Sequence, residues 1–92
     1  MNVRVVAAGE AAETLRAALA RVGLTERAGP PAAFVCTADD LPRALAMREL
    51  SQSAGPIVAL TADAARAIEA GADDAGGSPD EVARRLQEEL RR

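Results

Sequence analysis

Four acidic residues stand just after apolar, strand-like runs of this sequence, and they are its first candidates for chemistry: Glu10, Asp39, Asp40 and Asp63. If the runs form parallel strands, the residues that follow them meet at one edge of the sheet, where α/β proteins bind ligands. Carboxylates gathered there could hold Mg²⁺ or accept a phosphoryl group. We favour the simpler interpretation that each acid caps a helix or offsets its dipole, because capping requires no cooperation among the four.

Several residue types on which other chemistries depend are missing. The sequence contains no histidine, and all of its basic residues are arginine, so histidine catalysis and lysine Schiff-base chemistry are excluded. The single cysteine, Cys36, lies in an apolar run and is predicted to be a small buried hydrophobic residue and not a nucleophile. The sequence has neither a Walker motif nor a GxGxxG motif. We therefore expect no catalytic residue, no metal ligand and no cofactor.

Length and charge limit the class of protein further. The chain has 92 residues and a net charge of −3. This length predicts one domain over residues 1–92, and the acidic balance argues against nucleic acid as a partner. One cysteine forms no internal disulfide, and no apolar run is long enough to span a bilayer, so we expect a cytoplasmic protein with no membrane partner.

Apolar runs rich in β-branched residues predict three strands, over residues 3–7, 32–37 and 56–62. Residues 24–27 could add a short edge strand. Residues 72–77 have little strand character, and Asp73 and Asp74 are expected to form a solvated turn. The side chains expected to be buried in the sheet are Val5, Val35, Val58 and Leu60.

Helices alternate with these strands. Helical spacing and helix-start residues predict helices over 10–22, from 39–40 to about 51, over 64–70 and from 79 onward. Asp63 and Ser78 are the predicted N-caps of the last two helices. Glu81–Arg85 and Glu88–Arg92 are predicted ion pairs on the last one. This alternation predicts a small three-layer α/β/α fold around a mainly parallel sheet of four to five strands.

Two motifs in the second half carry a family resemblance. An apolar strand ends in Leu60-Thr61-Ala62, and the following helix ends in Gly71-Ala72-Asp73-Asp74. This combination resembles the second half of a bacterial response-regulator receiver domain, and Ser78-Pro79 stands where that family has Lys-Pro. The resemblance covers most of the chain, with the family's second helix missing or vestigial and its fourth trimmed. It implies a flavodoxin-like fold.

The resemblance also implies where a phosphorylation site would lie. In receivers, acidic residues after the first strand hold Mg²⁺, an Asp ending the third strand accepts the phosphoryl group, and a hydroxyl and a Lys from the next two strands contact its oxygens. In this sequence these positions fall, in that order, on Ala7 and Ala8, Thr37, Thr61 and Ser78. Only Thr61 keeps a suitable residue type, so the resemblance implies the fold and argues against the activity.

We therefore expect a pseudo-receiver, a receiver-like domain that is not an enzyme and acts as a phosphorylation-independent protein–protein interaction or signalling module. The alternative is a Mg²⁺-dependent phosphoacceptor that uses a displaced Asp39 or Asp40. The missing helix should uncover part of one sheet face or edge. We expect a protein partner and a homodimer, formed through the last helix and the short helix beside it, where Ala64, Ala65 and Ala67 would permit close approach.

Overall fold

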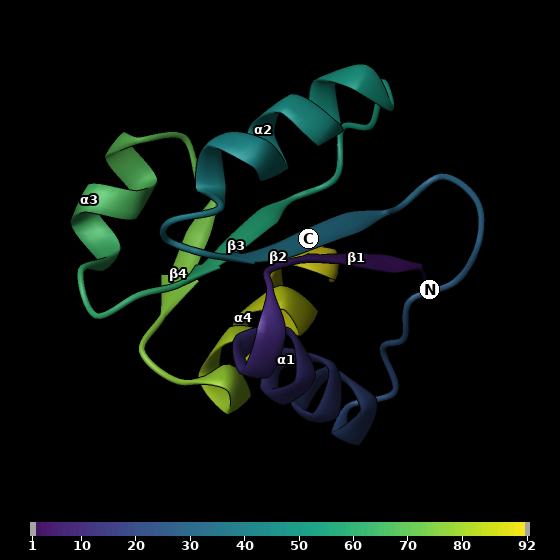
Figure 1. The fold of residues 1–92 in the computed structure, drawn as a ribbon, viewed down its shortest axis with the longest axis horizontal. Helices are drawn as coiled ribbons and strands as arrows, with labels where there is room; N and C mark the ends of the chain where they lie inside the picture. The colour runs from purple at the N-terminus through teal and green to yellow at the C-terminus, as the bar shows by residue number, and fades with distance from the viewer. Residues whose placement is uncertain (1, 92) are drawn as a thin grey trace.

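The computed structural model describes residues 2–91, over which four strands alternate with four helices (Figure 1). In chain order the elements are β1 (Val3–Val6), α1 (Gly9–Arg21), β2 (Ala33–Thr37), α2 (Leu41–Leu50), β3 (Ile57–Leu60), α3 (Ala64–Glu69), β4 (Asp74–Gly76) and α4 (Pro79–Leu90). The predicted α/β class is confirmed, because all strand pairs are parallel.

The strands lie in the order β1-β2-β3-β4. Residues 24–27, predicted as a possible edge strand, lie beside β1 and make one parallel bridge, between Asn2 and Thr25. The Val3 N–H donates to the Thr25 carbonyl at 3.2 Å. With this bridge counted as a vestigial second strand, the order is that of flavodoxin-like folds, in which the second strand lies outside the first.

Helices cover both faces of the sheet, as Figure 1 shows: α1 and α4 lie on one face, and α2 and α3 on the other. Alternate residues of each strand point to opposite faces. Toward α1 and α4 the core is built from Val and Leu side chains, among them Val35, Val58, Leu15 and Leu86. Toward α2 and α3 it holds Phe34, Ile57 and many alanines. Of the four side chains expected to be buried, Leu60 is only half-buried, because it ends β3 at the rim of the core.

Residues 72–77 have little β-propensity, so their composition did not predict the edge strand β4, although the receiver resemblance implies a strand before Ser78. Its backbone pairs with β3, and the Thr61 N–H donates to the Gly76 carbonyl at 2.9 Å. A Cβ on Gly76 would lie 2.9 Å from the Val82 nitrogen of α4. Small residues are therefore needed here because the strand packs closely against a helix, and this need outweighs propensity.

The prediction that Asp73 and Asp74 form a solvated turn is wrong for Asp74 and incomplete for Asp73, which is exposed in a bend but bonded to its neighbours. Asp73 accepts a hydrogen bond from the Ile57 N–H at 2.8 Å and pairs with Arg48 at 3.0 Å. Asp74 is half-buried in β4 and pairs with Arg85 of α4. Both carboxylates hold neighbouring elements together, which their position after a glycine-terminated helix did not indicate.

The predicted helix starts are confirmed where a side chain caps the helix. The Asp63 carboxylate accepts from the Arg66 N–H at 3.1 Å, and the Ser78 hydroxyl accepts from the Glu81 N–H at 3.2 Å. The predicted Glu81–Arg85 pair is present. Glu88 pairs instead with Arg84, one turn earlier, and its predicted partner Arg92 lies outside the described residues.

Candidate functional site

The carboxyl edge of the sheet is the candidate site, because the ends of four parallel strands meet there. The positions implied by the receiver resemblance all lie along it: Ala7 and Ala8 after β1, Thr37 at the end of β2, Thr61 after β3 and Ser78 after β4. Thr37 and Thr61 are half-buried, whereas Ala8 and Ser78 are exposed. The strands therefore bring these residue positions together, and the polar contacts around them decide what they can do.

Thr37, at the position of the phosphoacceptor, is bound to the start of α2. Its hydroxyl donates to Oδ2 of Asp40 at 3.0 Å, and the other oxygen of Asp40 lies 3.3 Å from Arg43. Asp40 occupies the N-cap position, but its carboxylate accepts no hydrogen bond from a helix N–H. The capping interpretation is therefore wrong for Asp40: its backbone lies at φ −95° and ψ 3°, outside the extended region that N-cap residues usually adopt.

Thr61 and Asp63 form a compact turn before α3. The Asp63 N–H donates to the Thr61 hydroxyl oxygen at 3.1 Å, while the Asp63 carboxylate caps the helix. A hollow of about 110 Å³ lies between this turn and the start of α2, and Thr61, Asp63 and Arg66 are among its lining residues. The capping interpretation holds for Asp63, and the retained hydroxyl of Thr61 serves the same local turn.

The acidic residues do not gather into a metal site. Glu10 lies exposed in the first turn of α1, as dipole compensation predicts, and Asp39 is exposed before α2. Within residues 2–91, no group of three His, Cys, Asp or Glu side chains could hold a metal ion. Because Mg²⁺ is held by carboxylates and other oxygen ligands, the donor set on this edge does not fit it.

Cys36 is fully buried in β2. Burial raises the pKa of its thiol to about 12, and the charge of Asp40 adds to the effect. Since only the thiolate is a strong nucleophile, Cys36 is inert at neutral pH. This agrees with its interpretation as a small hydrophobic core residue.

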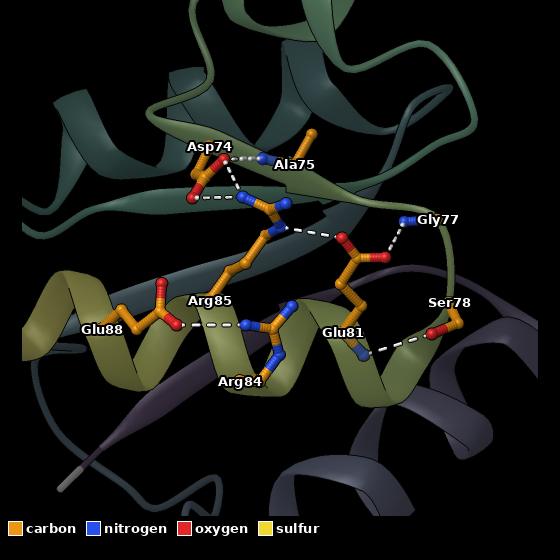
Figure 2. A network of polar contacts seen from close by, with 8 residues as sticks. All are labelled: Asp74, Ala75, Gly77, Ser78, Glu81, Arg84, Arg85 and Glu88. Atoms are coloured by element: carbon orange, nitrogen blue, oxygen red, sulfur yellow. Dashed lines mark hydrogen bonds and ion pairs between the residues drawn. The ribbon is translucent and has the colours of Figure 1, made fainter.

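A network of charged side chains fixes β4 to α4 (Figure 2). Arg85 contacts Asp74 at 3.3 Å and donates to Glu81 at 3.0 Å. The second oxygen of Glu81 accepts from the Gly77 N–H at 3.2 Å. The hydrogen bonds from Arg85 and then from Gly77 lower the pKa of Glu81, and the bond to Glu81 raises the pKa of Arg85. This end of the sheet is thus occupied by contacts that position a helix.

Both edges of the sheet are closed by a carboxylate bound to an arginine, a feature that sequence reasoning missed. At β1 the Val5 N–H donates to Glu26 at 3.1 Å, and Glu26 also pairs with Arg16. At β4 the Ala75 N–H donates to the Asp74 carboxylate at 2.8 Å. Burial raises the pKa of Glu26, but the hydrogen bonds from Arg16 and Val5 outweigh it, so the pKa lies below 4.5. A further strand would have to displace one of these charged pairs.

Comparisons with protein-family models, with curated proteins and with solved structures found no match. Over residues 2–91, no helix is both long enough and apolar enough to cross a membrane. The geometry of the described residues therefore has to support the function by itself.

Proposed function

We propose that this chain is a phosphorylation-independent pseudo-receiver that acts as a protein-interaction or signalling module and not as an enzyme. The observation that carries the proposal is the make-up of the carboxyl edge. Ala7 and Ala8 stand where a receiver holds Mg²⁺, and Thr37 stands where it carries the acceptor Asp, with its hydroxyl already bound to Asp40. The flavodoxin-like strand order, with its vestigial second strand, supports the receiver resemblance at the level of fold alone.

Phosphoryl transfer depends on neutralising charge on the transferred group. In a receiver that charge is met by Mg²⁺ and a Lys; here the Lys position is Ser78, whose hydroxyl caps α4. Thr37 has no carboxylate and forms no acyl phosphate. Asp40, one of the two candidates for a displaced acceptor, is engaged by Thr37 and Arg43. These features favour a module that binds without being phosphorylated.

The proposal is tested by adding Mg²⁺ and beryllium fluoride, a phosphoryl mimic, to the isotope-labelled protein and following its amide resonances. We expect no saturable shift at Thr37, Asp39 or Thr61. A receiver that accepts phosphate serves as the positive control under the same conditions. Saturable shifts clustered at those residues would overturn the proposal in favour of a Mg²⁺-dependent phosphoacceptor using Asp39 or Asp40.

The proposed partner is another protein, in the cytoplasm, and self-association remains part of the proposal. The surface expected for a homodimer needs one correction: α3 and α4 flank β4 from opposite faces of the sheet and do not lie side by side (Figure 1). Ala67 is buried against the protein's own core, so Ala64, Ala65 and the 48% exposed Ile68 of α3 are what this surface offers. Sedimentation over a range of concentrations measures it, and a monomer mass throughout would rule the dimer out.

A further inference from the structure

An open groove of about 490 Å³ lies on the α2 face of the sheet, beside β1. Its walls include Arg4 of β1, Pro30 of the following loop, and Met47 and Leu50 near the end of α2, and buried Phe34 also borders it. Leu50 is 84% exposed, far more than Ile68, the other exposed large apolar residue of the described chain. A large apolar side chain left in water beside a hollow is a feature of binding surfaces.

The groove exists because the chain omits a helix. Parallel strands are normally joined by a crossover of a dozen or more residues that carries a helix. Between the bridge at Thr25 and the start of β2, residues 26–32 form no helix, and Figure 1 shows this segment as a plain loop on the outer side of β1. On this face α2 and α3 are therefore the helices that cover the sheet, and the part near β1 stays open.

The charge of the groove indicates what would fill it. Arg4 is half-buried and forms no hydrogen bond or ion pair within residues 2–91, and no acid is among the lining residues. Glu26 attracts Arg4 at a distance, but its carboxylate is already bound by Arg16 and the Val5 N–H. Two copies meeting groove to groove would bring two Arg4 side chains together with no carboxylate between them. The occupant must therefore supply the acid, and a second copy in that arrangement does not.

We propose that the groove receives an amphipathic helix from a partner protein, with its apolar face on Met47 and Leu50 and an Asp or Glu facing Arg4. Binding of this kind replaces the omitted helix of the fold by one supplied from outside. It displaces none of the charged pairs that close the two sheet edges. The inference rests on the proposed function, since it names the surface through which the interaction module binds.

The test uses a displayed library of helical peptides of about 15 residues, near the length at which isolated helices become stable. The library is selected on the wild-type protein and counter-selected on Leu50→Asp, a change at an exposed site that we expect to leave the fold intact. We expect the enriched peptides to be amphipathic and to carry an acid. Arg4→Gln should weaken their binding about tenfold, the value of a hydrogen bond to a charged group.

Two matched variants serve as controls. Ile68→Asp changes the other exposed large apolar residue, and Arg66→Gln changes an exposed arginine whose side chain has no ion pair within residues 2–91. Both should leave peptide affinity unchanged. Circular dichroism checks that every variant is folded, and Arg4→Gln provides a second test that does not depend on Leu50→Asp.

The proposal is overturned if no sequence is enriched over the counter-selection, or if the enriched peptides lack an acid and ignore Arg4→Gln. It is also overturned if the wild-type protein is a dimer in sedimentation and Leu50→Asp makes it a monomer, because a second copy then fills the groove. The beryllium fluoride titration fails or succeeds independently of these outcomes. If beryllium fluoride causes no shift at the carboxyl edge and no helical peptide binds, only the groove proposal is overturned.

Discussion

The carboxyl edge of the sheet and the groove beside α2 use their side chains in opposite ways. At the edge, Thr37, Thr61 and Asp63 each bond to a neighbour within a few residues and hold the start of a helix. In the groove, the side chains of Arg4 and Leu50 form no hydrogen bond or ion pair within residues 2–91. The comparison teaches that the place where α/β folds usually bind ligands here serves the protein's own structure. We propose that binding takes place instead at the groove on the α2 face of the sheet.

The largest expected effect tests how closely the carboxyl end of β4 packs against α4. Gly76→Ala would place a Cβ 2.9 Å from the Val82 nitrogen and 3.1 Å from the Glu81 carbonyl carbon, and backbone atoms cannot give way cheaply. We expect the free energy of unfolding to fall by about 1–3 kcal/mol, as for other overpacked sites, measured by urea denaturation. The neighbouring Gly77→Ala is the control, since its Cβ would meet only Glu81 Oε2 at 3.8 Å. Equal stability of the two variants would mean that β4 and α4 are not closely packed at Gly76.

A smaller effect separates an acid that caps from one that does not. Asp63→Ala removes the N-cap of α3 and should lower the free energy of unfolding by about 1 kcal/mol. Asp39→Ala should change it by less than about 0.5 kcal/mol, because the Asp39 side chain forms no hydrogen bond or ion pair within the described chain. Asp63→Asn, which keeps a capping oxygen, should recover most of the loss. A larger cost for Asp39→Ala than for Asp63→Ala would assign Asp39 a structural role that these contacts do not show.

The smallest expected effect is the contribution of Glu81 to the pH dependence of the protein's stability. Its pKa is lowered from 4.5 in the folded state, so its contribution to stability is complete above pH 4.5 and is lost as the pH falls through the lowered value. Glu81→Gln should therefore flatten the acid limb of a plot of urea midpoint against pH. Glu49→Gln removes an exposed acid with no hydrogen bond or ion pair in residues 2–91 and should leave that limb unchanged. An equal flattening by both variants would show that the Arg85 and Gly77 contacts do not matter in solution.

Local features of this chain could be predicted from its sequence. The apolar runs around Val35 and Val58 gave the central strands, and Asp63 and Ser78 marked helix starts, because a cap bonds within its own turn. The order of the elements was enough to place the candidate site at one edge of a parallel sheet. An uncovered part of the sheet was also expected from the missing helix.

The features that sequence reasoning missed depend on contacts between distant residues. Asp74 meets Arg85, and Glu26 meets the Val5 N–H, only after the sheet and helices have packed. The composition of β4 follows from the close approach of Gly76 to α4, and β-propensity does not take such a contact into account. The groove was not located either, because Arg4 and Leu50 lie far apart in the sequence.

The central claim is that the carboxyl edge carries no phosphoryl chemistry, and one measurement tests it most directly. The wild-type protein and Thr37→Asp are incubated with Mg²⁺ and acetyl phosphate, and their intact masses are recorded. The account predicts that neither mass changes, because a restored acceptor still lacks the Mg²⁺ carboxylates and the Lys that would neutralise the phosphoryl charge. A phosphoryl group gained by Thr37→Asp alone would show that other residues of the edge supply that neutralisation. A phosphoryl group gained by the wild-type protein, and lost in Asp39→Asn or Asp40→Asn, would contradict the claim outright.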